Sequence, residues 1–198
     1  MTNPFTAHVD IDSGRISPPA GLLVTRYLRD MAGMYQLPIS DPDRVVYEVH
    51  YVDTPTGSAD LSACTTILHP GQVGDEFHMT KGHFHAIRDR AEFYFTLSGE
   101  GRLLLALEDG GHQTLDMLPG TANYIPGHWG HRSVNVGDEP LIFFAVFIAD
   151  AGYDYAIIES QGFPVIVMAD GDQVTLRPNP RYRLLSEQIM AARGDLIA

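Results

Sequence analysis

The sequence predicts an all-β domain, either an antiparallel sandwich or a barrel. Short segments rich in β-branched and aromatic residues recur along the chain, Gly and Pro turns separate them, and little helical pattern stands between them. The chain has 198 residues and 44% hydrophobic content, which is enough for one domain with a sizeable core. We therefore expect residues 1–198 to form a single domain, with the barrel over residues 45–178.

Short helices are expected on both sides of the barrel. Residues 1–44 are predicted to be an N-terminal extension with a short helix, because apolar residues recur at helical spacing between positions 19 and 34. Covering an end of the barrel and contacting another subunit would both suit this helix. Residues 179–198 are predicted to be a C-terminal helical segment, with a helix over 182–193 that Gly194 stops.

The barrel strands follow one another in chain order, and turn residues end each of them. Ser98 to Gly101 are expected to turn the chain between two strands as a hairpin, and Asp170-Gly171 to turn the last hairpin. Residues 155–161 fit neither helix nor strand clearly. The predicted strands comprise 45–52, 61–68, 76–79 leading into 83–85, 92–97, 101–107, 112–118, 123–125, 131–135, 141–148, 163–168 and 173–176.

Charge and cysteine content exclude several classes of protein. The formal net charge is −12, so binding to nucleic acid is not expected. Cys64 is the single cysteine, which excludes an intrachain disulfide and a zinc site built from cysteines. We find no secretory signal pattern and no apolar run of membrane-spanning length, so we expect a cytoplasmic protein without a membrane partner.

Two histidines and a glutamate near the middle of the chain are the best candidates for chemistry. His83 and His85 are separated by one residue, so on a β-strand their imidazoles lie on the same face. Glu92 opens the next predicted strand. A carboxylate and two imidazoles suit a divalent transition metal such as iron, manganese or zinc. The remaining histidines have plainer interpretations as packed or surface residues, although His78 is close enough in sequence to point into the same pocket.

These residues belong to a wider spacing scheme of two segments. The first runs Gly82-His83-x-His85, six residues, Glu92, six residues, Gly99, and the second runs Gly120, five residues, Pro126-Gly127, three residues, His131, three residues, Asn135. The two segments resemble the paired motifs of the cupin family. The resemblance implies a single cupin barrel (a double-stranded β-helix or jelly roll) with a metal held by His83, His85, Glu92 and His131. His128 is a rival for the fourth ligand, because the second motif more often has Pro-x-Gly before its histidine.

Several stretches resemble one branch of the cupins more closely, the cupin-type glucose-6-phosphate isomerases of archaea and some bacteria. The matching stretches comprise 26–31, 45–49, 65–71, 74–85, 89–94, 119–121, 131–135 and 149–155. The resemblance implies an enzyme that interconverts glucose 6-phosphate and fructose 6-phosphate in glycolysis and gluconeogenesis. It also implies a sugar phosphate as the partner, a homodimer, and one divalent transition metal per chain, with Fe²⁺ ahead of Mn²⁺ or Zn²⁺.

The same resemblance assigns roles at the phosphate end of the site. It places Tyr47, Thr66, Thr80, the backbone of Gly82, and Tyr155 near the phosphate. Hydroxyl groups donate hydrogen bonds to phosphate oxygens, and glycine lets a backbone N–H approach closely. The neighbouring Lys81 would either add positive charge there or face solvent.

The implied reaction moves a proton from C-2 to C-1 of the sugar through an enediol. Glu92 is the candidate base, since it is the one carboxylate of the group, and Tyr94 is a candidate for hydrogen bonding to substrate oxygens. The metal would stabilise the developing negative charge. A metal-assisted hydride shift needs no base and stays an alternative.

The chain departs from this family pattern at two positions. It has Phe147 where the family has a tyrosine, and Tyr153 where the family has a histidine. Phenylalanine donates no hydrogen bond, and tyrosine titrates far from imidazole. Two alternatives therefore stay open, namely another cupin metal enzyme such as a dioxygenase, and a non-catalytic cupin that binds a sugar phosphate.

Overall fold

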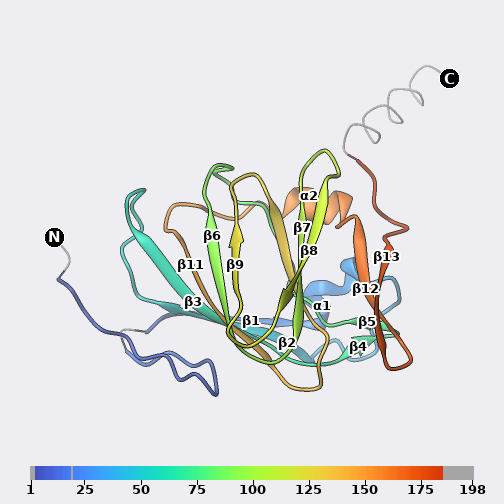
Figure 1. Ribbon diagram of the computed structural model, residues 1–198, viewed down its shortest axis with the longest axis horizontal. Helices are drawn as coiled ribbons and strands as arrows, with labels where there is room; N and C mark the ends of the chain where they lie inside the picture. Colours follow the sequence, from blue (N-terminus) through green and yellow to red (C-terminus); the bar gives the residue numbers. More distant parts are fainter. Residues whose placement is uncertain (1–2, 19, 185–198) are drawn as a thin grey trace.

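The computed structural model describes residues 3–18 and 20–184. Its larger sheet has six strands (Figure 1). In sheet order the strands are β1 (Ala20–Tyr27), β2 (Val45–Val52), β3 (Leu61–Leu68), β11 (Leu141–Ile148), β6 (Glu92–Ser98) and β9 (Ala122–Ile125). Every neighbouring pair is antiparallel. Valine, isoleucine, phenylalanine and tyrosine dominate β2 and β11, as expected for strands that pack on both faces.

Two smaller sheets pack against the six-stranded sheet. One has the order β10 (Gly130–Asn135), β7 (Gly101–Ala106) and β8 (His112–Met117), and the other has β13 (Gln173–Pro178), β12 (Val165–Asp170), β5 (Glu76–Phe77) and β4 (Gln72–Val73). A single hydrophobic cluster includes Phe143 of the large sheet, Leu103 of the second and Val167 of the third. The sheets therefore share one core, and the predicted all-β cupin barrel is confirmed.

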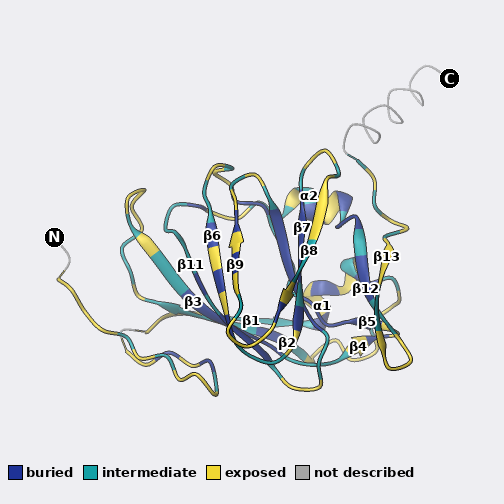
Figure 2. Cartoon of the chain, viewed as in Figure 1, coloured by how far each residue is buried: buried dark blue, intermediate teal, exposed yellow. Residues whose placement is uncertain are grey.

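Burial follows the two-residue period of the strands. From Glu92 to Thr96, β6 alternates between buried and exposed positions, because successive side chains point to opposite faces. In contrast, β10 is buried at all six of its positions. Figure 2 shows buried positions in dark blue along the strands and exposed positions along the N-terminal arm. A predicted metal ligand on β10, His131, is therefore deeply enclosed.

Helical turns are short in the described part of the chain. They are α1 (Leu28–Met31), the 3-10 turn η1 (Ala32–Met34) and α2 (Ala156–Gln161), which occupies the stretch that the sequence left ambiguous. The predicted C-terminal helix lies, from residue 185 on, outside the described residues. Among residues 3–18 and 20–184, no helix has the length and apolar character needed to cross a membrane.

The predicted helix over residues 19–34 is wrong for most of its length. Residues 20–27 form β1, which pairs with β2 so that Arg26 lies opposite Tyr47. Leu22 and Leu23 are 66% and 51% exposed, so their spacing does not mark a buried helical face. The partner strand decides the conformation here, and local spacing does not reveal it. β1 belongs to the large sheet although it precedes residue 45, where we expected the barrel to begin.

The predicted hairpin between residues 92–97 and 101–107 is also wrong. β6 pairs with β11 and β9, whereas β7 pairs with β10 and β8, so the chain passes from one sheet to another. Gly99 has a φ of +78°, and a Cβ atom there would lie 2.4 Å from the carbonyl oxygen of Pro140. Glycine is therefore needed at position 99, because the backbone passes too close to Pro140 to leave room for a Cβ atom. The last predicted hairpin, β12 with β13, is confirmed.

Residues 83–85 are extended but belong to no named strand. His83 forms an isolated bridge with His131, and Phe84 forms one with Asp154. Two backbone hydrogen bonds of 3.2 and 3.0 Å join His83 and His131. The rings of His83 and His85 lie 5.5 Å apart between centroids. The segment is therefore attached to β10 by a short bridge instead of a full ladder, and the two imidazoles still lie close together.

Candidate active site

A cavity of about 520 Å³ lies against the inner face of the six-stranded sheet. Strand alternation builds its wall, because every second residue of each strand points inward. The strand residues that line it are Gly21, Leu22, Val24 and Arg26 of β1, Tyr47, Val49, Tyr51 and Val52 of β2, Ser62, Cys64 and Thr66 of β3, Phe143, Ala145 and Phe147 of β11, Glu92 and Tyr94 of β6, and His131 of β10. The wall is therefore mixed, with apolar rows interrupted by hydroxyl, carboxylate and imidazole groups.

Three of the four predicted metal ligands, His83, Glu92 and His131, line this cavity, and the fourth, His85, lies beside them. One ligand atom from each of His83, His85, Glu92 and His131 lies within 4.8 Å of the others. Glu92 comes from β6, His131 from β10, and the two histidines from the extended segment between β5 and β6. The rival His128 is exposed and stands outside this group, so the structure favours His131 as the fourth member.

Hydrogen bonds orient the imidazoles of this group. Nδ1 of His85 lies 2.8 Å from the carbonyl oxygen of Arg90, so this nitrogen carries the proton and donates. Nε2 of His85 then faces Oε2 of Glu92 at 3.2 Å, and Nε2 of His131 faces the same oxygen at 3.1 Å. The Nε2 atoms are therefore directed at the centre of the group, as metal-ligating histidines require.

Burial and neighbouring charges set the protonation of the group. Burial raises the pKa of the Glu92 carboxyl, but the adjacent imidazoles of His131 and His85 outweigh burial and bring the pKa to about 2. Burial lowers the pKa of His83 well below its ordinary value, and the neighbouring His131 adds to this effect. For His85, burial lowers the pKa, but the hydrogen bond to Glu92 outweighs it and raises the pKa. An ionised carboxylate and a neutral His83 are the forms that bind a metal.

These residues fit a divalent transition metal. Nε2 of His83 is buried and has no hydrogen-bond partner among the described residues. A buried polar nitrogen without a partner is unfavourable, and a bound cation would satisfy it. Three imidazoles and one carboxylate also leave coordination positions open for substrate or water.

The five residues predicted at the phosphate all line the same cavity, and the structure brings Tyr47, Thr66, Thr80, Gly82 and Tyr155 together. The hydroxyl oxygen of Tyr47 accepts a 3.4 Å hydrogen bond from the N–H of Lys81, and that of Thr80 accepts a 3.0 Å bond from the N–H of Ser133. Gly82 has a φ of +72°, and a Cβ atom there would lie 2.9 Å from the carbonyl oxygen of His131. Only glycine therefore suits this position.

Lys81 does not line the cavity. Its Nζ lies 2.5 Å from Oε1 of Glu159 on α2 and 4.6 Å from the centre of the Tyr155 ring. The lysine is therefore engaged in an ion pair and a cation–π contact. The sequence left two interpretations of Lys81 open, namely a contact with the phosphate or a position in solvent. The structure shows neither, because the lysine pairs with Glu159.

Arg26 is a cavity residue to which the sequence assigned no role. It is the only lysine or arginine among the described residues that line the cavity. The signal was present, since Arg26 opens one of the stretches that match the isomerases. Assigning residues 19–34 to a helix concealed it, because the alternation of Leu22, Val24 and Arg26 toward one face appears only in a strand.

The two departures from the family pattern, Phe147 and Tyr153, also lie in the cavity wall. Phe147 on β11 lies directly opposite Glu92 on β6. The hydroxyl of Tyr153 lies 2.7 Å from that of Tyr51, and its ring lies 4.7 Å from the His83 ring. Burial raises the pKa of Tyr153, so its hydroxyl is protonated at neutral pH.

Tyr94 is buried beside the metal group. Its ring meets that of His131 edge-on at 5.8 Å and packs against Phe143 at 4.6 Å. Burial raises its pKa well above the ordinary value, and the charge of Glu92 adds to this. The hydroxyl therefore remains a proton donor in the cavity.

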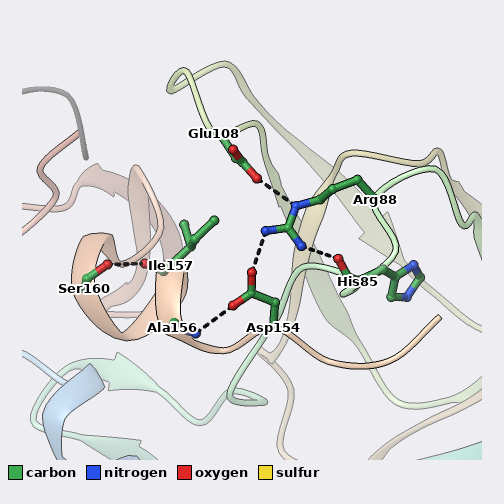
Figure 3. Close-up of polar contacts among 7 residues, drawn as sticks. All are labelled: His85, Arg88, Glu108, Asp154, Ala156, Ile157 and Ser160. Atoms are coloured by element: carbon green, nitrogen blue, oxygen red, sulfur yellow. Dashed lines mark hydrogen bonds and ion pairs between the residues drawn. The ribbon is translucent and has the colours of Figure 1, made fainter.

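Arg88 ties the metal group to the loop before α2 (Figure 3). Its Nη1 donates to the carbonyl oxygen of His85, and its Nη2 donates to Oδ2 of Asp154 at 2.5 Å. Its Nε donates to Oε1 of Glu108 at 2.8 Å. Tyr153 and Tyr155, the residues on either side of Asp154, line the cavity. Arg88 therefore joins the backbone of His85 to the segment that carries these two tyrosines.

The barrel and its group of three imidazoles and one carboxylate define the class of protein, which is that of the cupins. Residues 25–183 match the family model described as glucose-6-phosphate isomerase (GPI). The chain belongs to this family and is an enzyme of the aldose–ketose isomerase class. The matched residues include the whole metal group and all five residues predicted at the phosphate.

Curated proteins named glucose-6-phosphate isomerase are similar over most of the chain. The protein of Pyrococcus horikoshii is 44% identical over 186 residues, which cover 91% of this chain and 97% of that protein. The protein of Thermococcus gammatolerans is 42% identical over 186 residues, covering 90% and 96%. A protein of Rhizobium meliloti named putative glucose-6-phosphate isomerase 2 is 37% identical over 169 residues, covering 82% and 84%. Among solved structures, an oxalate decarboxylase of Bacillus subtilis is 27% identical with a TM-score of 0.44, covering 60% of this chain and 29% of that chain.

Proposed function

We propose that the enzyme interconverts glucose 6-phosphate and fructose 6-phosphate through an enediol, using a divalent transition metal bound by His83, His85, Glu92 and His131. One observation carries the proposal: His83, Glu92 and His131 of the metal group line one cavity of about 520 Å³ together with the five predicted phosphate residues, and His85 completes the group beside them. A sugar phosphate has a charged end and a reacting end, and this cavity offers a suitable set of groups to each.

The phosphate end would be held by neutral donors. Tyr47, Thr66, Thr80 and Tyr155, which carry hydroxyl groups, line the cavity together with Gly82. Hydroxyl and amide groups donate hydrogen bonds to phosphate oxygens. Gly82 is two residues from Thr80 and one from His83, so the segment fixes the separation between the bound phosphate and the metal group.

The reacting end would lie at the metal group. A divalent cation held there supplies Lewis-acid stabilisation of negative charge on the sugar oxygens. Fe²⁺ is our first choice and Mn²⁺ or Zn²⁺ are alternatives, since this set of donor atoms accepts all three. Tyr94 lines the same cavity and would donate a hydrogen bond to a sugar oxygen.

Glu92 would move the proton in the open-chain sugar. Its carboxylate takes the proton from C-2, the electron pair of that C–H bond forms the C-1 to C-2 double bond, and the aldehyde oxygen takes a proton from solvent to give the enediol. The 2-hydroxyl then returns a proton to solvent as it becomes the ketone, and C-1 takes the proton that Glu92 holds. This route requires an ionised carboxylate, which Glu92 has at neutral pH.

Solvent isotope incorporation separates this route from a direct hydride shift. During turnover of fructose 6-phosphate in deuterium oxide, a proton held on Glu92 exchanges with solvent, and deuterium appears at C-2 of glucose 6-phosphate. A hydride that passes directly between carbons leaves the product free of deuterium. NMR of the product therefore chooses between the two routes.

The function itself is tested by a coupled assay on metal-free and reconstituted protein. Dialysis against a chelator should abolish the conversion of fructose 6-phosphate to glucose 6-phosphate, and Fe²⁺, Mn²⁺ or Zn²⁺ should restore it. No conversion with any of the three metals supplied contradicts the proposal. Full activity in protein shown by elemental analysis to be metal-free contradicts the metal dependence alone.

We also propose that the enzyme is a homodimer. Apolar side chains gather on the outer face of β6 and β9, where Phe93, Phe95 and Tyr124 are 43%, 42% and 58% exposed. Exposed apolar patches on a soluble protein often mark contacts between subunits. Sedimentation equilibrium of the intact chain and of a Phe95→Glu variant tests this, and a monomeric wild-type protein would contradict it.

A further inference from the structure

Arg26 is the one lysine or arginine that the described cavity wall offers to a sugar phosphate. We propose that Arg26 binds the substrate phosphate directly and sets the preference of the enzyme for phosphorylated over neutral sugars. This inference rests on the proposed function, in which the phosphate lies in the cavity. The phosphate residues named so far are neutral, so Arg26 adds the charge that they lack.

The backbone places Arg26 beside the neutral phosphate donors. Arg26 on β1 lies opposite Tyr47 on β2, and directly opposite residues of an antiparallel pair are neighbours on one face. Although burial lowers the pKa of the Arg26 guanidinium, the hydroxyls of Tyr47 and Tyr155 raise it. All three residues line the cavity together with Thr66, so a phosphate held by these hydroxyls lies within reach of Arg26.

Among the residues that the structure describes, Arg26 has no carboxylate counter-ion. The chain has a formal net charge of −12, and the described acidic residues of the cavity wall are Asp53 and Glu92. The ion pairs of the described residues engage Lys81 with Glu159 and leave Arg26 without a carboxylate partner. A phosphate dianion that approaches an acidic protein therefore meets one uncompensated cation in the cavity.

The chemistry of the guanidinium suits this role. Burial lowers the pKa of Arg26, but Tyr47 and Tyr155 outweigh burial and raise it, so the group stays charged throughout the physiological range. The planar guanidinium donates two parallel hydrogen bonds to two phosphate oxygens, which a lysine ammonium does not. A neutral hydroxyl forms hydrogen bonds with both sugar hydroxyls and phosphate oxygens, whereas a cation is also attracted by the net charge of the phosphate. The positively charged guanidinium therefore favours a phosphorylated sugar over a neutral one.

Steady-state kinetics of Arg26→Gln against a matched control test the proposal. Arg29→Gln is the control, because Arg29 is an exposed arginine three residues further on that pairs with Asp43 and does not line the cavity. We expect Arg26→Gln to raise the KM for fructose 6-phosphate about 10- to 100-fold, as removal of a charge-assisted hydrogen bond does, while kcat changes less than about threefold. The inhibition constant of inorganic phosphate should rise by a similar factor. Arg29→Gln should keep wild-type values.

Three further measurements make the result decisive. Arg26→Lys should regain part of the lost affinity, since it restores the charge without the two parallel hydrogen bonds. If Arg26→Gln fails to fold by circular dichroism, Arg26→Met keeps an apolar stem at the position and should show the same rise in KM. Wild-type KM and phosphate inhibition in a folded Arg26→Gln or Arg26→Met variant overturn the proposal.

Direct binding separates failure of this inference from failure of the proposed function. Calorimetry with inorganic phosphate on the metal-loaded protein needs no turnover. If the wild type shows no isomerase activity but loses phosphate binding on Arg26→Gln, the proposed reaction fails and the phosphate site stands. If the wild type is active and Arg26→Gln binds phosphate as tightly as the wild type, the reaction stands and the role of Arg26 fails.

Discussion

The hydroxyl groups of Tyr51 and Tyr153 lie 2.7 Å apart on the cavity wall, and the Tyr153 ring stacks on that of Tyr155. The hydrogen bond thus holds Tyr153, the residue that stands where the family has a histidine, in place beside His83.

We predict that Tyr51→Phe raises the KM for fructose 6-phosphate about fivefold, since a neutral hydrogen bond contributes about 1 kcal/mol. Steady-state kinetics check this, with Tyr124→Phe on the outer face as the control. Equal KM values in all three proteins would show that the pair does not position the substrate.

Replacing Glu92 with glutamine should remove both metal and activity. The amide keeps the size of the side chain but lacks the negative charge that faces His85 and His131. We expect kcat to fall by about 10²- to 10⁴-fold, the range for loss of a general base, and the metal content to fall as well. Asp89→Asn, an exposed carboxylate on the turn before β6, is the control. A Glu92→Gln variant with wild-type turnover would exclude Glu92 as the base.

Gly82→Ala should destabilise the protein more than an alanine at another left-handed glycine. Gly171 has a φ of +60° with nothing within 4 Å of an added Cβ, so Gly171→Ala should cost about 1–2 kcal/mol for conformation alone. At Gly82, the added Cβ would lie 2.8 Å from the Phe163 ring and 2.9 Å from the His131 carbonyl oxygen. Overpacking adds about 1–3 kcal/mol there. Urea unfolding measures both, and equal losses would argue against the close approach.

The Asp154 carboxylate should contribute stability that depends on acid pH. The hydrogen bond from Arg88 lowers the pKa of Asp154 in the folded state. Its contribution is therefore complete above the ordinary aspartate pKa of about 4 and is lost as the pH falls through the lower folded value. We predict that Asp154→Asn lowers Tm at pH 7 and that the difference from wild type shrinks below about pH 4.

Thermal melts from pH 7 to about pH 2.5 check this prediction. Asp172→Asn, on the exposed turn between β12 and β13, is the control and should melt as the wild type does. A difference between Asp154→Asn and wild type that stays constant over the whole range would contradict the linkage. Because Arg88 also donates to the His85 carbonyl, loss of Asp154 should weaken metal retention too.

Strands with a strong composition were predictable from the sequence, and pairings were not. Residues 45–52, 61–68 and 141–148 form strands with the predicted bounds, because β-branched and aromatic residues dominate them. Residues 20–27 were misread because both faces of β1 carry apolar residues and its pairing with β2 is a long-range contact. The supposed hairpin at Gly99 failed for a related reason. A glycine turn looks the same whether the chain returns to its own sheet or crosses to another.

The site was more predictable than the topology, because motif spacing records which residues must meet. The structure brings the four predicted ligands together and places all five predicted phosphate residues in one cavity. The roles of these residues remain predictions. Charge was harder to place, since Lys81 pairs with Glu159 whereas Arg26 faces the cavity. The sequence does not show that Lys81 has a carboxylate partner in Glu159, because these residues are 78 positions apart and meet only in the folded chain.

The position of β1 at the edge of the large sheet separates two parts of the cavity wall. β1 pairs with β2 alone, whereas β6, which carries Glu92, is paired with β11 and β9. Breaking one ladder requires less free energy than breaking two, so native-state fluctuations open β1 more often than β6. Exchange of a ligand at Arg26 on β1 and retention of an ion at Glu92 on β6 should therefore depend on different sets of hydrogen bonds, so that one can occur while the other is undisturbed.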